Sequence, residues 1–409
     1  MKQSMKSQPS ICQKACRAQW LRYTFCVLAA LWLTAMPTLA QDEDDSLATD
    51  IKVTLLSVAP GYTAYTAHGH CALRMQCPSA GIDISFTYGL DDNVHNRMAF
   101  FAGSGMGEYS AVYTSDYLQE YADEGRRVEE YELNLSLNEK RQLWALLDNE
   151  LMNGASRRYN YLHTNCSSMC AYAVGRALDG DRLDYQQLPP ALLGTYRDFV
   201  RHISRNRPWV SFFWLSLLSA EGEKRGQLED KLSPQLLVEA WQQAMLVDSL
   251  GSRRPMIIGE GRVLVSGDDG SRTIWFTPTL FFILLLVFVL LISFAEWKGC
   301  CHRLVLGTDI FLLAAQTVVG LLLCYMSFVS ELVGAAGNWL VLIFNPLPLL
   351  LWLFCRHRSW YHGCYLFYVV VLAMFVCMTP LNPQIDFSHS LLAIVLGVRC
   401  LARYIQYKK

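Results

Sequence analysis

The sequence carries almost no net charge, because its 35 lysines and arginines stand against 36 aspartates and glutamates. Proteins that bind nucleic acid through its phosphates need a basic face, so this balance argues against a nucleic acid partner. Charged residues are missing altogether from Trp275 to Ala295, a stretch long enough to cross a membrane. This distribution divides the chain into a polar part, residues 41–270, and an apolar part, residues 275–405.

Cysteine is scarce in the polar part. Of the 14 cysteines in the chain, it holds only Cys71, Cys77, Cys166 and Cys170. An oxidising compartment tends to pair such thiols. If Cys166 stays free, at most one bridge forms among the other three. Cys71–Cys77 is one candidate pair, although spacing alone does not establish it.

The N-terminus predicts a signal peptide over residues 1–40. Five basic residues between Lys2 and Arg22 precede an apolar segment, Cys26–Met36, which is too short to span a bilayer. Thr38-Leu-Ala40 offers a small-residue cleavage site, and no cysteine stands directly after it, so this is not itself a lipoprotein signal. An uncleaved signal anchor is the alternative, and it would export the same domain.

Five apolar stretches predict a bundle of about five membrane helices in residues 275–409. They cover residues 275–295, 304–326, 339–355, 361–379 and 388–405.

The loops between these stretches predict the orientation. Lysine and arginine follow the first, third and fifth stretches, whereas loops 327–338 and 380–387 contain neither. The positive-inside rule therefore places the C-terminus in the cytoplasm and residues 41–274 outside. We expect a multi-pass protein of the bacterial inner membrane, with a periplasmic domain at 41–255 and a linker at 256–274.

The alternation of apolar residues in the polar part predicts an α+β domain. Strands are expected at 52–59, 72–75, 82–88, 108–113 and 128–133. Ser136 and Glu139 fit a capping box that begins a helix, and Cys166 opens a second helix that runs from Ser167 to Leu178. Residues 181–255 look helical and irregular.

His70 and Cys166 are the candidate catalytic pair. A cysteine at a helix N-terminus lies at the positive end of the helix dipole, which stabilises the reactive thiolate. Asn165 can cap the same helix. His70 follows Gly69 at the edge of a strand, and a base on a strand that faces a cysteine at a helix start is the arrangement of papain-like enzymes. Because the histidine comes first in this chain, the arrangement would be circularly permuted.

Several motifs together resemble the Lnb-type bacterial lipoprotein N-acyltransferase family. The motifs are Gly69-His70-x-x-x-Arg74, Thr87-Tyr88-Gly89, Gly125-Arg126-Arg127-Val128, Leu133-Asn134-Leu135 and Tyr159-x-Tyr161-x-x-x-Asn165-Cys166. The apolar part, with Asn345-Pro346 and Pro383-Gln384, resembles the membrane extension of Bacteroidetes-type members. The chain departs from the family at Thr164, where an aspartate is usual, and at His68, where a small residue is usual.

The resemblance implies a fold, a reaction and its partners. The fold is a permuted papain-like (NlpC/P60-like) exported domain followed by the membrane bundle. The reaction is acyl transfer through a thioester on Cys166 to the α-amine of a lipidated N-terminal cysteine, with His70 as the base. The partners are diacylglyceryl-modified lipoproteins and membrane lipids, and neither a cofactor nor a metal is expected.

Other residues are candidates for supporting roles. A third group should orient His70. Candidates for it are Asp83, Ser85 and Tyr88. Asn165 is a candidate for orienting a group or for donating to the oxyanion, and His68 is an alternative base. Residues expected to contact the substrate are Arg74, Arg126, Arg127 and Tyr161.

Three other readings remain open from the residues alone. Histidines and cysteines near positions 70 and 166 supply zinc ligand types, but their spacing matches no standard zinc motif. A papain-like cysteine amidase or peptidase of the cell envelope would use the same pair, although it rarely needs five spans. A non-catalytic membrane-anchored envelope factor would tolerate Cys166→Ser and His70→Ala.

Overall fold

The computed structural model of the protein describes residues 50–63, 65–90, 94–227, 231–272, 274–355, 357 and 360–408. The expected signal peptide lies outside these residues. All described residues after Asp50 belong to one unit, Ile51–Lys409.

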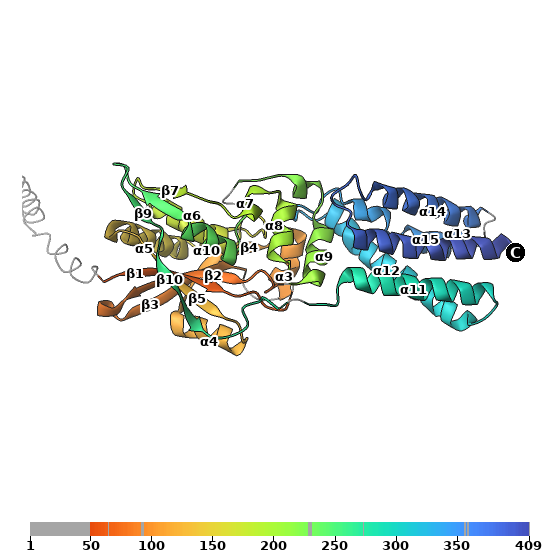
Figure 1. Ribbon diagram of the computed structural model, residues 1–409, viewed down its shortest axis with the longest axis horizontal. Helices are drawn as coiled ribbons and strands as arrows, with labels where there is room; N and C mark the ends of the chain where they lie inside the picture. The colour runs from red at the N-terminus through yellow and green to blue at the C-terminus, as the bar shows by residue number, and fades with distance from the viewer. Residues whose placement is uncertain are drawn as a thin grey trace, which may run out of the picture. The chain divides into compact units, whose positions relative to one another are not determined.

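An antiparallel seven-stranded sheet forms the centre of the periplasmic part, in the order β10-β5-β1-β2-β3-β4-β6 (Figure 1). The five expected strands are all present in it. The strands are β1 Lys52–Val58, β2 His70–Cys77, β3 Ile82–Gly89, β4 Met106–Tyr113, β5 Val128–Leu133, β6 Ser156–Arg158 and β10 Ile257–Val265.

Two segments differ from the sequence prediction. The expected linker contains β10, which pairs with β5 and forms the edge of the main sheet. The segment expected to be helical and irregular also contains a second sheet, in the order β7-β8-β9. Its strands are short, which explains why no alternation marked them in the sequence. They are β7 Arg182–Tyr185, β8 Ala244–Val247 and β9 Arg253–Pro255.

Helices cover both faces of the main sheet (Figure 1). Along β2, Cys71 and Leu73 face the core shared with helices α5 and α6, whereas Ala72 faces the core shared with α4. The helices of this part are α3 Val94–Ala102, α4 Thr114–Asp123, α5 Leu137–Met152, α6 Cys166–Ala177, α7 Pro190–Leu193, α8 Tyr196–Ile203, α9 Pro208–Leu217 and α10 Pro234–Gln242, with 3-10 turns η1 Pro78–Ala80 and η2 Ala220–Glu223.

Capping at the starts of α5 and α6 follows the sequence. The side chain of Ser136 accepts from the N–H of Glu139, and the Glu139 carboxylate accepts from the N–H of Ser136. Leu143 and Leu147 then lie fully buried on one face of α5. The helix that was expected to open at Cys166 is α6, so this prediction is confirmed.

Four helices among the described residues are long and apolar enough to cross a membrane: α11 Pro278–Trp297, α12 His302–Phe328, α14 Tyr361–Met378 and α15 Phe387–Lys408. The expected third span is interrupted. It consists of η3 Trp339–Leu342 and the short helix α13 Leu347–Cys355. Pro346 lacks an N–H for a helical bond, and the side chain of Asn345 instead donates to the carbonyls of Val341 and Leu342. The expected count of five spans is therefore not reached by these helices.

Ion pairs join the end of α11, the first part of α12 and the last part of α15. Arg399 on α15 donates to Asp309 on α12 at 2.7 Å and to Glu296 on α11 at 2.9 Å. Arg403 also pairs with both carboxylates. Two positive and two negative charges balance here, which makes their burial tolerable.

The periplasmic part contacts the membrane part through α9. The Ser216 hydroxyl lies 2.8 Å from Nε2 of His389 on α15, and the amide of Asn338 donates to the Ser216 carbonyl at 2.6 Å. Phe212 stacks on His389. Helix α9 therefore contributes buried residues to the core and also contacts the membrane helices.

Candidate active site

His70 is the first residue of β2, and its position depends on the glycine before it. Gly69 has φ +80°, and a Cβ at this position would lie 2.6 Å from the Val58 carbonyl oxygen. A larger residue would therefore push the start of β2 away from β1. The imidazole of His70 packs against Tyr117 and Tyr121 of α4, with ring centroids 6.4 Å away in both cases.

Thr87 on β3 holds the imidazole. Nε2 of His70 lies 2.5 Å from the Thr87 hydroxyl oxygen. This contact leaves Nδ1 of His70 as the nitrogen that can act on a neighbouring group. The sequence predictions for a third residue fell on Thr87's neighbours, although Thr87 belongs to one of the motifs. The sequence alone does not show how β2 and β3 pair. Their register pairs Thr87 with Ala72 and so brings Thr87 close to His70.

Cys166 is the first residue of α6, and Asn165 fixes this helix start. The Asn165 side chain accepts from the N–H groups of Ser167 and Ser168 at 2.9 and 3.0 Å. Its amide nitrogen donates to the carbonyls of Tyr161 and Leu232. Both the oxygen and the nitrogen of the Asn165 side chain are thus engaged, and these contacts anchor the backbone at Cys166.

The structure brings Cys166 and His70 together. Both a hydrogen bond with His70 and its charge act on the Cys166 thiol and lower its pKa. Three stronger effects raise the same pKa well above its usual range: first the hydrogen bond with Cys71, then burial, then the charge of Cys71. The resting thiol is therefore protonated, and a base must remove its proton as it attacks.

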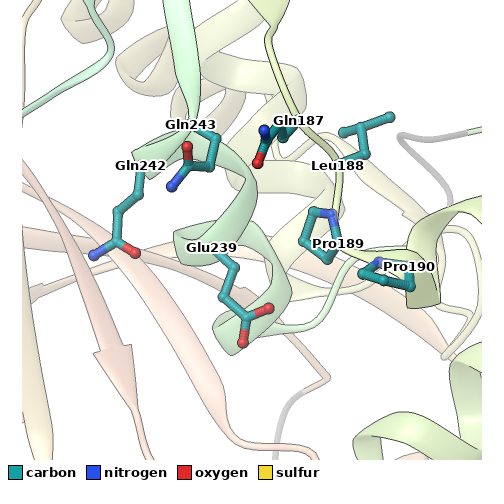
Figure 2. Close-up of a pocket in the computed structure, with 7 residues that line it drawn as sticks. All are labelled: Gln187, Leu188, Pro189, Pro190, Glu239, Gln242 and Gln243. Atoms are coloured by element: carbon teal, nitrogen blue, oxygen red, sulfur yellow. The ribbon is translucent and has the colours of Figure 1, made fainter.

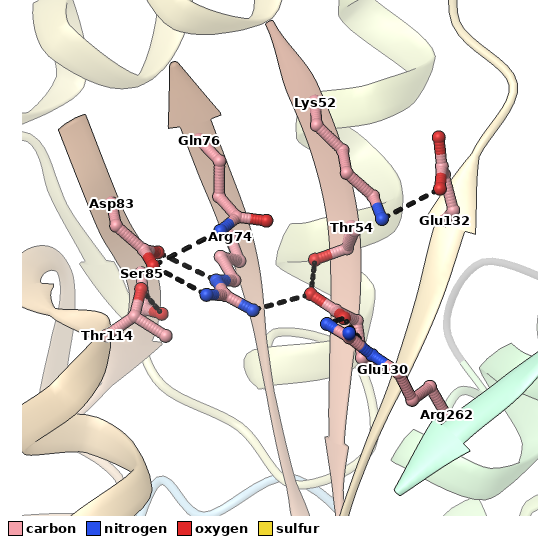
Figure 3. A network of polar contacts seen from close by, with 10 residues as sticks. All are labelled: Lys52, Thr54, Arg74, Gln76, Asp83, Ser85, Thr114, Glu130, Glu132 and Arg262. Atoms are coloured by element: carbon pink, nitrogen blue, oxygen red, sulfur yellow. Dashed lines mark hydrogen bonds and ion pairs between the residues drawn. The ribbon is translucent and has the colours of Figure 1, made fainter. Parts of the chain in front are cut away.

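Asp83 and Ser85 do not approach His70. Asp83 pairs with Gln76 in the register, at the other end of β2 from His70, about 20 Å along the strand. Arg74 holds the Asp83 carboxylate at 2.7 Å (Figure 3). Ser85 shares a hydrogen bond with Thr114 at 2.9 Å.

Arg74 is committed to protein carboxylates as well. Besides Asp83, its guanidinium donates to Glu130 at 2.7 Å, and only 10% of its side chain is exposed. Arg262 on β10 and Thr54 on β1 also donate to Glu130 (Figure 3). This network links β10, β5, β1, β2 and β3 across one face of the sheet, which explains the arginine without a substrate head group.

Arg126 and Arg127 occupy different surroundings. Arg126 is buried, donates to the Ala59 carbonyl at 2.9 Å and stacks on Tyr121, whose ring also contacts His70. Arg127 is more exposed and pairs with Glu129 at 2.5 Å. Arg126 therefore supports the Tyr121 ring that packs against His70, whereas Arg127 lies closer to the surface.

Aromatic residues line the side of the site that is closer to α9. Tyr88 is fully buried, stacks on Tyr159 and donates to the Arg157 carbonyl at 3.3 Å, so it lies apart from the Thr87 contact. Tyr161 packs on Trp214 of α9 with ring centroids 4.5 Å apart.

His68 faces the same aromatic group. Its ring lies 5.8 Å from that of Trp214, and neither ring nitrogen has a hydrogen-bond partner among the described residues. Burial, assisted by the charge of Arg207, lowers the pKa of His68 to about 4. A histidine with this pKa is a weak base, so the geometry favours His70 over His68.

No group of three or more His, Cys, Asp or Glu side chains within the described ranges is arranged to hold a metal ion. A pocket of about 290 Å³ lies elsewhere, between α10 and the segment before α7 (Figure 2). None of the candidate site residues lines it. Its lining residues are Gln187, Leu188, Pro189, Pro190, Glu239, Gln242 and Gln243.

Comparison with known proteins gives two matches to family models. The Lnb N-terminal periplasmic domain matches residues 42–201, and the Lnb transmembrane domain matches residues 270–409. No curated protein and no solved structure matches the chain.

Proposed function

Because this chain belongs to the Lnb family, as its motifs indicated and both domain matches establish, we propose that it acylates the N-terminus of lipoproteins. The substrate is a diacylglyceryl-modified lipoprotein with a free α-amine on its first cysteine. The chain is a membrane protein with a periplasmic domain, and the proposed place of action is the outer face of the bacterial inner membrane.

The observation that carries this proposal is the contact of His70 with Cys166 at the start of α6. In the first step, Nδ1 of His70 takes the thiol proton while the sulfur attacks an ester carbonyl carbon of the lipid. The carbon–oxygen bond to the glycerol then breaks, and His70 returns the proton to the leaving alcohol. The acyl chain remains on Cys166 as a thioester.

In the second step, the α-amine of the lipoprotein attacks the thioester. His70 accepts a proton from the amine, and the proton passes to the departing sulfur, so that the amide forms and the Cys166 thiol is regenerated. The mechanism requires the tautomer in which Nε2 carries a proton and donates it to the Thr87 hydroxyl, 2.5 Å away, so that Nδ1 is free for both steps. This role is the one that a third catalytic group fulfils in papain-like enzymes, and we propose a permuted papain-like arrangement on this basis.

Backbone donors support the developing negative charge on the carbonyl oxygen. Asn165 already occupies the N–H groups of Ser167 and Ser168. We therefore assign the oxyanion to the backbone N–H of Cys166 itself, at the positive end of α6.

The aromatic residues beside the site suit a fatty acyl chain. Tyr159 is close enough to Cys166 for the thiolate charge to raise the tyrosine's pKa, after the larger effect of burial. Phe100, Tyr161 and Trp214 extend this aromatic group into the core, with ring centroids 4.5 to 6.5 Å apart. From Trp214, α9 leads to Phe212 and the membrane helices. An apolar chain would thus stay in contact with apolar side chains between bilayer and thiol.

Mass spectrometry of lipoprotein N-termini tests the proposal. Cells that lack the protein are complemented with the wild type, Cys166→Ser, His70→Ala or His68→Ala. We expect N-terminal acylation with the wild type and His68→Ala only. If Cys166→Ser restores acylation, or if loss of the protein leaves acylation unchanged, the proposal is wrong.

The same measurement separates two acyl donors. If the chain moves within one lipoprotein, the product carries one acyl chain on the glycerol and one on the amine. If the chain comes from a phospholipid, the product carries three acyl chains.

A further inference from the structure

Helix α6 packs on the main sheet at β2 (Figure 1). Three thiols lie at this contact. Cys71 follows His70 on β2, and its Sγ lies 3.8 Å from Sγ of Cys170, one turn after Cys166 on α6. The Ser167 hydroxyl lies 3.5 Å from Sγ of Cys71 and 3.8 Å from Sγ of Cys166. Cys71, Cys166 and Cys170 are all buried and reduced in this structure.

The sequence suggested a different pairing, Cys71 with Cys77. Both residues lie on β2 and point to the same face, six positions apart. Their Cα atoms are therefore about 20 Å apart, whereas a disulfide needs less than about 7 Å. The Cys71–Cys77 pairing is wrong, and Cys170 takes the place of Cys77 as the neighbour of Cys71.

We propose that Cys71 and Cys170 form a disulfide in the periplasm and that this bond keeps Cys166 available as a thiol. The two Sγ atoms are already in contact, and rotation about the Cα–Cβ bonds is the movement that joins them. The bond closes a loop that contains β3, β4, β5 and β6, and it ties β2, which begins with His70, to α6, which begins with Cys166.

The protective role follows from the position of Cys71 between two partners. As a free thiol, Cys71 also lies beside Cys166. The Ser167 hydroxyl is 3.5 Å from Sγ of Cys71 and 3.8 Å from Sγ of Cys166, and the neighbouring Cys71 thiol raises the pKa of Cys166. Oxidation at that contact would consume the nucleophile. Once Cys71 is bonded to Cys170, it has no thiol left to form a disulfide with Cys166. This second part of the inference rests on the proposed role of Cys166, whereas the disulfide itself does not.

The oxidant is a periplasmic thiol–disulfide oxidoreductase in its disulfide form. Its disulfide accepts two electrons and two protons from Cys71 and Cys170, so that one protein disulfide forms and the oxidoreductase leaves as a dithiol. Because both thiols are buried in the folded domain, the exchange takes place during folding, when they are still accessible.

Disulfide mapping of the full-length protein tests the bond. Cells are lysed in denaturant that contains N-ethylmaleimide, so that buried free thiols are blocked. The full-length protein is then purified, and its non-reduced peptides are identified by mass spectrometry. We expect a peptide that joins Cys71 to Cys170, and maleimide on Cys77 and Cys166. Maleimide on both Cys71 and Cys170, or a different link, overturns the proposal.

Three variants test the protective role, with iodoacetamide labelling of Cys166 as the readout. In Cys170→Ser we expect labelling of Cys166 to fall at least five-fold and to return after dithiothreitol. In Cys71→Ser/Cys170→Ser we expect full labelling, and Cys77→Ser, on the same face of the same strand, is the matched control. Undiminished labelling in Cys170→Ser contradicts protection. Mapping and labelling need no acyl transfer, so a failure of the proposed function leaves both results interpretable.

Discussion

Nε2 of His70 lies 2.5 Å from the hydroxyl oxygen of Thr87, across the boundary between β2 and β3. The contact gives the imidazole one orientation and leaves its other nitrogen for Cys166. In the proposed mechanism, this threonine takes the place that an acidic or amide group has in many other catalytic sites.

Thr87→Val keeps the shape of the side chain and removes the hydrogen bond. We expect the rate of acyl transfer to fall about ten-fold, which corresponds to the loss of one hydrogen bond of about 1.4 kcal/mol in the transition state. Thr87→Ser should restore most of the rate. The measurement is the rate of thioester formation on Cys166 by intact-protein mass spectrometry. A rate equal to that of the wild type in Thr87→Val would mean that Thr87 does not position His70.

Cys71→Ala should shift the reactivity of Cys166 toward lower pH. The hydrogen bond with Cys71 is the largest cause of the raised Cys166 pKa, so its removal lowers that pKa and increases the thiolate fraction at neutral pH. The measurement is the rate of iodoacetamide labelling against pH, in a reducing buffer that keeps all thiols free. Cys77→Ala is the control and should leave the profile where it is. An unchanged profile in Cys71→Ala would contradict the contact.

Glu130→Gln tests whether the network around Arg74 is structural. Glu130 is buried and accepts from Arg74 and Arg262, so loss of its charge should lower the free energy of unfolding by about 3 kcal/mol. Glu132→Gln is the matched control: it pairs with Lys52 at 2.8 Å on the half-exposed surface and should cost less than about 1 kcal/mol. Denaturant unfolding of the detergent-solubilised protein compares them. Equal losses would contradict the network's importance.

The same network predicts a dependence of stability on pH. Burial raises the pKa of Glu130, but hydrogen bonds from Arg262, Thr54 and Arg74 outweigh it, and the net pKa is lowered. A lowered folded pKa means that this stabilisation is fully present above the unfolded pKa of about 4.3 and is lost as the pH falls through the folded value. Glu130→Gln should therefore reduce the difference in stability between pH 6 and pH 3.

The sequence predicted the elements that carry the chemistry because each has a local signal. The capping box at Ser136 and the cap before Cys166 depend on residues within one helical turn. The partners of His70 and Arg74 lie on other strands, β3 and β5, so they depend on how these strands pair within the sheet. Only the structure shows these contacts, because they depend on the pairing of β2 with other strands and on the packing of α6 on the sheet. The partners found in this way are Thr87, Glu130 and Cys170.

The same reasoning explains the membrane part. Composition predicts that a stretch is apolar, but the interruption at Asn345 needs a neighbour to accommodate it. Gly320 on α12 supplies the space, because a Cβ there would lie 2.6 Å from the Cα of Asn345. The glycine and the break are one packing feature, and they are 25 positions apart in the sequence.

Asn165 combines a capping role with a tertiary one, and two substitutions separate them. Asn165→Asp retains the acceptor for the N–H groups of Ser167 and Ser168 but loses the donor to the carbonyls of Tyr161 and Leu232. Asn165→Ala loses both. We expect Asn165→Ala to lower the free energy of unfolding by about 2 kcal/mol and Asn165→Asp by about 1 kcal/mol.

The control for these variants is Ser136→Ala, which removes the cap of α5. It should cost about 1 kcal/mol of stability and leave Cys166 unaffected, because no candidate site residue lies at that helix start. Asn165→Ala, in contrast, should also slow thioester formation at least ten-fold, since the backbone N–H of Cys166 shifts with the helix start. Equal thioester rates in Asn165→Ala and Ser136→Ala would show that the start of α6 does not position Cys166 for the reaction.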